Sequence, residues 1–510
     1  MNRLALRRTA CLGILLGIVF ITLSCGNVAP GGGFGSTTGT GYVFIGDAPV
    51  PGSSILKFQI TLSSATLCPT VGSNGECQGT PQVSLISAPV TIELKQLELG
   101  SAFLSKNTVA TGTYAGVKLN FSNPVVKVLN TNGTIQELKG TSLPLSPTSV
   151  TPTFQSALTV TENSNFSFLL DLNINNSIQS SGGAITGIAP AVSLVPLPIT
   201  VSQPVVELED TKGTVAGLTK TCPTGSFNLL DSMTGISIAS VQFDGTSGFD
   251  TGLSCDTLAN NQIIEVDLEL QAPSQQTVQF FAKRLELLNL SSDQTLGGVI
   301  VQVNPFDQVN NKYSFVLLVQ DAQNVAAFSD GGLVTVDIDP TQAVFVVDSG
   351  TLTVDPTLFA SSTDLLAGQN VEINVRSASV VNGTNNCAAI SDACAAGAQQ
   401  IRLMKGNLTA QVLGTSTPNF NLTGLPSIFG TFTLLRQLSA DCQNCSISSA
   451  IVATSNQTAF EGGLTSFTDL QIGNTVTVRG LLFKNGFQGP GPIGNGSPTL
   501  VAGKVRLVAP

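Results

Sequence analysis

Residues 56–63 read Leu-Lys-Phe-Gln-Ile-Thr-Leu-Ser, with an apolar side chain at every second position. Alternate side chains of a β-strand point to opposite faces of the sheet, so the four apolar residues are expected on one buried face. Residues 117–121 and 264–270 repeat the pattern. In the second segment, Glu265, Asp267 and Glu269 alternate with apolar residues and are expected to face water. No helical stripe of comparable length competes, so these segments predict β-structure.

The composition agrees with an all-β chain. Of the 510 residues, 51 are Gly and 25 are Pro, and Thr, Val and Ser are abundant, which is typical of short strands joined by many turns. Hydrophobic residues make up 42% of the chain, enough for several buried cores. At roughly 100–200 residues per domain, the length predicts three or four β domains.

The first 25 residues have the pattern of a bacterial lipoprotein signal. Three arginines precede an apolar run, residues 10–23, that is shorter than the roughly 20 residues of a membrane-spanning helix. Ser24 is a small residue directly before Cys25, as lipidation requires. We therefore interpret residues 1–24 as the signal peptide and Cys25 as the lipidated first residue of the mature protein.

Two alternatives stay open at this signal. Thr22 stands where lipoprotein signals usually carry leucine, so ordinary cleavage near Ser24 is the second reading. The Arg7-Arg8 pair suggests twin-arginine export, but residues 9–12 continue that motif poorly. All three readings export the chain. The Gly-, Ser- and Thr-rich residues 25–41 that follow predict a flexible tether.

Three segments of the C-terminal part carry the same landmarks in the same order. Each has a glycine that opens a strand, a Phe-x-Leu strand, a Thr-to-Phe step, a regular strand and a closing strand led by alanine. The glycines are Gly213, Gly298 and Gly406; the Phe-x-Leu strands are 227–229, 315–317 and 420–422; the steps are 246–249, 357–359 and 458–460; the regular strands are 264–268, 371–375 and 476–478; and the alanines are Ala282, Ala398 and Ala502.

These landmarks divide the mature chain. A β-sandwich-like N-terminal domain is expected at 42–200, and β-barrel-like repeats are expected at 207–290, 296–404 and 405–510. Our hypothesis for the repeats is that they act as spacers or present sheet edges to a partner, reaching outward from the membrane.

Two family resemblances follow from these segments. The opening Tyr-Val-Phe-Ile-Gly-Asp-Ala-Pro at 42–49, the turn and strand at 112–114, and Leu-Leu-Asp-Leu at 169–172 ahead of Ala189-Pro190 resemble an uncharacterised domain family of bacterial lipoproteins. The three C-terminal units resemble a second uncharacterised family of exported β repeats, although Asn260-Asn261 replaces the glycine that precedes the regular strand in the other two units. Neither resemblance implies an activity.

The cysteines outside the signal and the anchor fall into four close pairs, one in each expected domain. The pairs are Cys68 with Cys77, Cys222 with Cys255, Cys387 with Cys394, and Cys442 with Cys445. An exported protein meets an oxidising environment, so local disulfides are the favoured interpretation, although eight cysteines allow 105 pairings. The Cys-x-x-Cys spacing of the last pair leaves a redox motif open, but no strand-then-helix pattern surrounds it. A zinc site is disfavoured because no second close pair and no histidine complete four ligands.

The chain contains no histidine, which removes the usual general base and most hydrolase designs. A carboxylate pair of the glycosidase type stays open, since its two acids meet only in space. The absence of Trp and the presence of only 3 Tyr disfavour large sugar platforms. A net charge of −10 argues against a nucleic-acid partner.

Two acidic groups offer the oxygen ligands that calcium prefers. They are Glu207, Glu209 and Asp210, and Asp337, Asp339, Asp348 and Asp355. Neither group has the spacing of a calcium loop, and Asp339 and Asp355 precede prolines as in ordinary turns. We interpret both groups as turns and solvated strand faces, and expect neither a metal nor another cofactor.

The sequence as a whole predicts an exported, all-β lipoprotein of the outer membrane, attached through a lipid on Cys25. The sequence leaves both the periplasmic side and the outer surface of that membrane as its location. We expect a structural or binding module for an envelope polymer or a protein partner, with no catalytic residue. The alternatives are a carboxylate-dependent enzyme acting on an envelope polymer and an accessory subunit of an envelope assembly.

Overall fold

The computed structural model confirms an all-β chain in which α1 (Ile174–Ser177) is a single helical turn. It describes residues 37–47, 55–97, 100–129, 135–201, 204–230, 237–249, 253–274, 277–288, 294–323, 325, 328, 331–350, 352–380, 394–416, 419–423, 449–484 and 498–507. The predicted signal and Cys25, Cys387, Cys442 and Cys445 lie outside these residues. Within the described ranges, no helix has the length and hydrophobicity of a membrane span.

The N-terminal part is a sandwich of two sheets. The first has the order β15-β12-β1-β7, formed by β15 (Val192–Leu197), β12 (Asn165–Leu172), β1 (Thr38–Asp47) and β7 (Ser101–Ala110). The second is built on β2 (Ile55–Cys68) and β8 (Gly112–Leu129), joined by β5 (Val83–Ser84), β6 (Val90–Glu93), β9 (Ile135–Lys139), β10 (Ser149–Val150) and β11 (Thr153–Val160). Two small hairpins complete this part, β3 (Thr70–Val71) with β4 (Cys77–Gln78) and β13 (Ile178–Ser181) with β14 (Ala184–Ile188).

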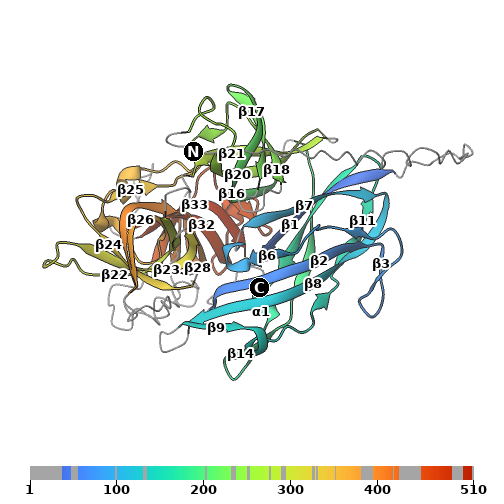
Figure 1. The fold of residues 1–510 in the computed structure, drawn as a ribbon, viewed down its shortest axis with the longest axis horizontal. Coiled ribbons are helices and arrows are strands. Elements are labelled where there is room, and N and C mark those ends of the chain that lie inside the picture. The colour runs from blue at the N-terminus through green and yellow to red at the C-terminus, as the bar shows by residue number, and fades with distance from the viewer. Residues whose placement is uncertain are drawn as a thin grey trace, which may run out of the picture.

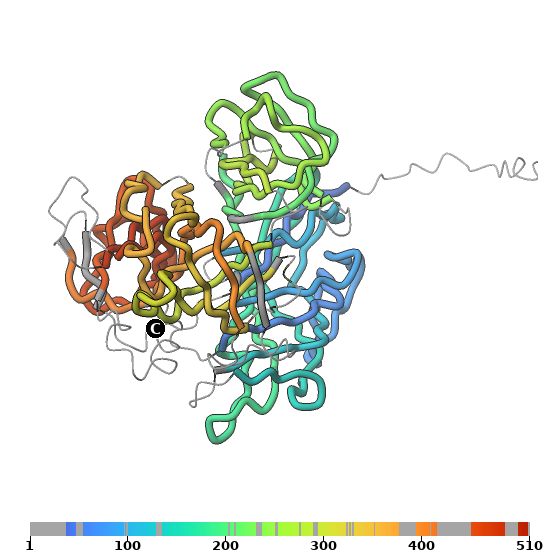
Figure 2. Tube along the Cα trace, turned by 60° about the vertical axis from the view of Figure 1, so that its left-hand side comes forward, coloured from blue at the N-terminus to red at the C-terminus, as the bar shows by residue number. Residues whose placement is uncertain are grey.

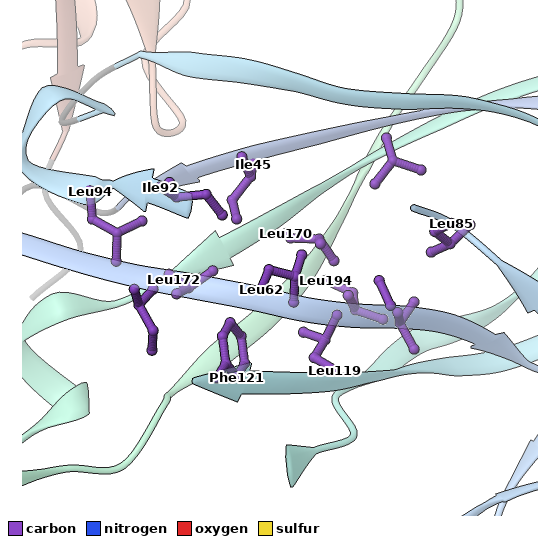
Figure 3. Close-up of a cluster of buried hydrophobic side chains, with 14 of the residues drawn as sticks. Ile45, Leu62, Leu85, Ile92, Leu94, Leu119, Phe121, Leu170, Leu172 and Leu194 are labelled. Carbon is purple, nitrogen blue, oxygen red and sulfur yellow. The ribbon is translucent and has the colours of Figure 1, made fainter. Parts of the chain in front are cut away.

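The sandwich core lies between the two sheets. Ile45 and Leu170 of the first sheet face Leu62 and Leu119 of the second, and all four belong to one buried cluster (Figure 3). β1 begins at Thr38, inside the segment predicted as a tether, because its backbone pairs with β7 from Thr38 onward. Gly and Thr contribute little to a core, but their backbone groups can still complete a ladder.

Leu56 breaks the alternation expected of residues 56–63. Phe58, Ile60 and Leu62 are fully buried in the sandwich core, as predicted. The ladder between β2 and β8 shifts register between Ile55 and Lys57, and such a bulge turns the side chain that follows to the other face. Leu56 therefore leaves the sandwich core and joins a cluster formed with the C-terminal part.

The C-terminal part contains three six-stranded sheets with one topology. Their strands are β16 (Pro204–Thr221), β17 (Thr224–Leu230), β18 (Ser237–Phe243), β19 (Gly248–Phe249), β20 (Ile263–Ser274) and β21 (Thr277–Leu287); β22 (Gln294–Val303), β23 (Tyr313–Gln323), β24 (Leu333–Ile338), β25 (Val344–Val347), β26 (Asn370–Val380) and β27 (Cys394–Met404); and β28 (Gly406–Ser416), β29 (Asn419–Thr423), β30 (Ser449–Ala453), β31 (Ala459–Glu461), β32 (Thr475–Phe483) and β33 (Thr499–Leu507). We name them barrels 1, 2 and 3.

Each barrel closes by the same pairing. In barrel 1 the order is β18-β17-β16-β20-β21, and β18 pairs with β21 in parallel to close the circle; barrels 2 and 3 repeat this through β24–β27 and β30–β33. Numbering the five long strands along the chain gives the circular order 1-2-3-5-4. This is the order of the oligonucleotide/oligosaccharide-binding (OB) fold, a five-stranded Greek-key barrel.

Register shows which landmarks of the three repeats are equivalent. The Phe-x-Leu strands match, since Leu229 and Leu317 pair with Val215 and Ile300 at one barrel position, as Leu422 does with Val412. Two predicted landmarks are wrong. Gly213 and Gly298 lie within strands and correspond to Ala410, not to Gly406. The pairing shows this, because Gly213, Gly298 and Ala410 pair with the equivalent residues Ile264, Val371 and Val476. The short strand of barrel 2 contains Phe345, which pairs with Ile401, whereas Phe359 ends a 3-10 turn packed against it.

The Asn260-Asn261 departure has a conformational explanation. Asn261, Gly368 and Gly473 occupy the same turn, each donating its backbone N–H to the first strand, and their φ angles are 70°, 97° and 92°. This left-handed region favours glycine, but asparagine is the side chain that adopts it most readily. The first unit therefore keeps the turn of the other two.

The barrels pack against the sandwich and against one another (Figures 1 and 2). Tyr42 and Phe44 of β1 lie in the core cluster of barrel 1, where Phe280 meets Phe103 at a ring-centroid distance of 4.8 Å. Leu56 packs in a cluster that contains side chains of barrels 2 and 3. In this arrangement the repeats fold back on the N-terminal part, unlike the outward-reaching spacers that we expected.

Disulfides join Cys68 to Cys77 in the sandwich and Cys222 to Cys255 in barrel 1. Cys394 is also disulfide-bonded. The first two bonds are pairs that the sequence predicted, and each closes a local loop. The pairing of Cys387, Cys442 and Cys445 stays a prediction.

Candidate functional site

Barrel 2 has a polar hollow of about 480 Å³ on its surface. Four segments form it: the loop between β22 and β23, the end of β24 with the turn after it, β26 through Arg376, and the start of β27. Its lining residues are Asn310, Asn311, Lys312, Asp337, Ile338, Asp339, Thr341, Arg376, Ala395, Ala396 and Gly397. The volume lies in the range of small-ligand sites. On β27 no lining side chain is larger than a methyl group, which leaves space above the strand.

The loop that forms one wall is specific to barrel 2. In barrel 2 the pairing of the first two long strands ends at Val303 and Phe315, and residues 304–312 form a loop. In barrels 1 and 3 the same two strands stay paired as far as Thr221 with Thr224 and Ser416 with Asn419. In OB folds, the loop between strands 1 and 2 and the face of strands 2 and 3 contribute to ligand binding. The same fold is thus present three times, and one copy carries an enlarged loop at the usual ligand position.

Asp307 organises this loop. Its backbone N–H and carbonyl pair with those of Lys312 at N–O distances of 2.9 and 3.2 Å, and its Oδ1 accepts the backbone N–H groups of Val309 (2.9 Å) and Asn310 (3.1 Å). The Asn310 side chain donates to Oδ2 at 2.7 Å and lowers the pKa of Asp307. These bonds hold the loop tip in shape before any ligand arrives, which lowers the entropic cost of binding.

The charged groups of the hollow are arranged in oppositely charged neighbours. Lys312 Nζ lies 2.9 Å from Asp337 Oδ2. Asp339 Oδ1 accepts the backbone N–H of Thr341 at 2.9 Å and its hydroxyl at 2.7 Å, and the hydroxyl bond is the main cause of the lowered pKa of Asp339. Arg376 adds to this lowering and donates a hydrogen bond to Gln342.

A second cluster of charges lies between barrels 1 and 2, largely buried except at Lys212 and Asp321, whose side chains are 28% and 43% exposed. Arg284 of β21 meets Asp348 at 2.8 Å and Glu286 at 2.9 Å, and Glu286 also binds Arg402 of β27. Lys212 of β16 lies 3.6 Å from Glu265 and 3.4 Å from Asp321 of β23. We call these seven residues the junction cluster.

The expectation that Glu265, Asp267 and Glu269 face water is wrong. Their exposed fractions are 5%, 7% and 8%. Alternation places them on the outer face of barrel 1, but barrel 2 covers the side that carries Glu265, through Asp348 and Arg402. Asp348 is likewise buried instead of lying on a solvated strand face.

The acids of this cluster do not suit a metal ion. Glu265, Glu286 and Asp348 offer oxygens within 4.8 Å of one another. Lys212, Arg284 and Arg402 already neutralise those carboxylates at ion-pair distance. A divalent ion would meet three cations at the position it had to occupy, so we assign the cluster to packing of the two barrels.

The acidic residues Asp337, Asp339 and Asp355 and the residue Glu207, which the sequence singled out, lie in turns, in an ion pair or on a strand. Asp355 accepts the backbone N–H of Thr357 at 2.9 Å and its hydroxyl at 2.6 Å, as Asp339 does with Thr341, so both form the predicted turns. Asp337 pairs with Lys312. Glu207 lies on β16 opposite Glu269, away from the hollow.

Sequence reasoning missed the hollow. Asn310, Asn311, Lys312 and Arg376 carry no motif, and they meet only when the barrel closes. The signal that points to them is the extra length between the second glycine landmark and its Phe-x-Leu strand, compared with the other two repeats.

The N-terminal part matches a known family. Residues 38–187 match the model of a domain of unknown function, DUF4382. The match spans the sandwich from β1 into β14 and agrees with the N-terminal resemblance to an uncharacterised family. No curated protein matches this chain.

Proposed function

We propose that this protein is an exported, lipid-anchored binding module whose ligand site is the hollow of barrel 2. The observation that carries the proposal is the enlarged, pre-organised loop 304–312, which forms one wall of the hollow in one of three barrels of equal topology. The OB topology supports the location by analogy of fold. The ligand class is an envelope polymer, since the signal predicts export to the cell envelope.

Binding is favoured over catalysis by the charges of the hollow. A glycosidase needs one carboxylic acid that stays protonated near neutral pH to serve as the general acid. Hydrogen bonds from Thr341 lower the pKa of Asp339 and keep it ionised, while Asp337 is held by Lys312. These two carboxylates are suited to hydrogen bonding with a ligand.

The binding proposal predicts co-sedimentation with envelope material. Purified protein is mixed with peptidoglycan sacculi and with extracted envelope polysaccharide, and the pelleted fraction is measured. Arg376→Ala and Asn311→Ala each remove a polar group from the hollow and are expected to weaken binding by about tenfold, the value of one good hydrogen bond to a charged group. Ile472→Ala, at a 69% exposed position of barrel 3, serves as the control and is expected to leave binding unchanged. Equal pelleting of all four proteins would exclude the hollow as the site.

The anchor is tested separately. Cells that express the full chain are labelled with a palmitate analogue, and the protein is expected to carry the label, since Cys25 follows a lipoprotein-type signal. The label is expected to disappear in Cys25→Ser. A native protein without label would refute lipidation and leave ordinary export as the reading of the signal.

A further inference from the structure

We propose that the hollow of barrel 2 takes a neutral oligosaccharide, with the ring of Phe306 as the platform for an adjoining sugar. The inference rests on the proposed function, because it names the ligand class of the same site.

The charge arrangement excludes a site built for polyanions. Two cations and two carboxylates line the hollow, and Lys312 is already paired with Asp337 at 2.9 Å. A site for an anionic polymer or a nucleic acid needs cations that are free to replace the counterions of the ligand. Here Asp337 and Asp339 would instead repel the phosphates or carboxylates of such a ligand. A ligand without net charge avoids that repulsion.

The open hydrogen-bonding groups suit sugar hydroxyls. Within the described residues, Asp339 accepts the hydrogen bonds of Thr341 with Oδ1, which leaves Oδ2 as a further acceptor, and Arg376 gives one hydrogen bond to Gln342. Asn310 donates its amide to Asp307, which leaves its carbonyl oxygen as an acceptor. Planar carboxylate, amide and guanidinium groups provide paired acceptors and donors at fixed spacing. Neighbouring hydroxyls of a sugar ring act as donor and acceptor and match this set.

The loop also carries an exposed apolar surface. Phe306 is 37% exposed and packs against Tyr313 with a centroid distance of 4.5 Å, and Val309 on the same loop is 92% exposed. An apolar side chain at such exposure gains free energy when a ligand covers it. Phe306 does not line the hollow itself but lies on the same loop, four residues before the lining residue Asn310. The C–H face of a sugar ring is apolar while its edge is polar, so an oligosaccharide whose end occupies the polar hollow and whose next sugars follow the loop covers this ring.

The test uses the full-length protein on a printed panel of neutral and acidic oligosaccharides, including chitohexaose, cellohexaose and hexagalacturonate. Wild-type protein is expected to bind at least one neutral oligosaccharide, with little change between 0.05 and 0.5 M salt because no ion pairs form with the ligand. Phe306→Ala and Arg376→Ala are each expected to weaken that binding by about tenfold. Val344→Ala, at a 56% exposed position on β25 outside the hollow, is the matched control and is expected to bind as the wild type does.

The outcomes separate the ligand class from the site. Binding to acidic oligosaccharides alone, or binding that falls steeply with salt, would overturn the neutral ligand while leaving barrel 2 as the site, provided Arg376→Ala still weakens it. The protein could also bind nothing on the panel and still sediment with envelope polymer in a way that Arg376→Ala weakens. That result would overturn the neutral oligosaccharide as the ligand. Neutral binding that Phe306→Ala and Arg376→Ala leave intact would overturn the placement in the hollow.

Discussion

Replacing Arg402 with methionine is expected to lower the free energy of unfolding of barrels 1 and 2 by about 3 kcal/mol, the cost of breaking a buried ion pair. Arg402 of barrel 2 binds Glu286 of barrel 1, and the Glu286 side chain is only 7% exposed. Without the guanidinium, Glu286 keeps Arg284, which it must share with Asp348. Urea unfolding followed by circular dichroism measures the loss.

The control for Arg402→Met is Lys283→Met. Lys283 lies 3.0 Å from Glu269, but its side chain is 36% exposed, so water replaces the lost pair and the expected cost is below about 1 kcal/mol. The double variant Glu286→Leu with Arg402→Met removes both charges and is expected to recover most of the loss, because Arg284 keeps Asp348. An Arg402→Met variant as stable as the wild type would contradict a packed junction between the barrels.

Arg402→Met is also expected to change the pH dependence of the free energy of unfolding in a defined direction. Burial raises the pKa of Glu286 above its usual value, against the pull of Arg402. A carboxyl group whose pKa is raised on folding stabilises the fold below its unfolded pKa, and this stabilisation is lost as pH rises through the folded pKa. Arg402 lowers the pKa of Glu286 by its charge and hydrogen bond, so the pKa of Glu286 is expected to rise further in the Arg402→Met variant. The deficit of the variant is therefore expected to grow as pH rises from about 4 upward, measured by unfolding at a series of pH values.

Replacing Phe280 with alanine is expected to lower the free energy of unfolding by about 3–5 kcal/mol, the usual range for removal of a buried aromatic side chain. Phe280 of β21 is 4% exposed and contacts Phe103 of the sandwich at 4.8 Å and Tyr42 at 6.5 Å between ring centroids. The substitution leaves a cavity in the cluster that joins barrel 1 to the sandwich, so both parts are expected to lose stability together.

Phe306→Ala is the matched control for Phe280→Ala, since it removes the same side chain at an exposed position. Its expected cost is below about 1 kcal/mol, because water already contacts that ring. Thermal unfolding of the two variants measures the difference. Equal stability of both would mean that the sandwich and barrel 1 do not share a core.

Local patterns of the sequence predict the strands well and their surroundings poorly. A period of two reports which side chains point away from a barrel interior, as for Glu265, but it cannot report that barrel 2 covers this face. Leu56 shows the second limit, because the β-bulge beside it depends on pairing with β8. The three-fold repeat could be recognised since the Phe-x-Leu strands and the three alanines recur at equivalent barrel positions, although Ala282, Ala398 and Ala502 lie within their strands and do not begin them.

The hollow lay beyond prediction for a different reason. Lys312, Asp337 and Arg376 come from three elements that the closed barrel brings to one place, and none of the three belongs to a motif. The extra residues between β22 and β23 were visible in the sequence, but only the register of the three barrels shows that they form an insertion at a ligand position.

The most direct test of this account exchanges that loop. Residues 304–312 are replaced by Thr-Pro, the pair found at 417–418 in barrel 3, and the full-length variant is compared with the wild type for co-sedimentation with envelope polysaccharide and for thermal unfolding. We predict that binding is lost while the cooperative unfolding transition is kept, since barrels 1 and 3 form with only two residues between their first two strands. Undiminished binding by the folded variant would contradict barrel 2 as the binding site.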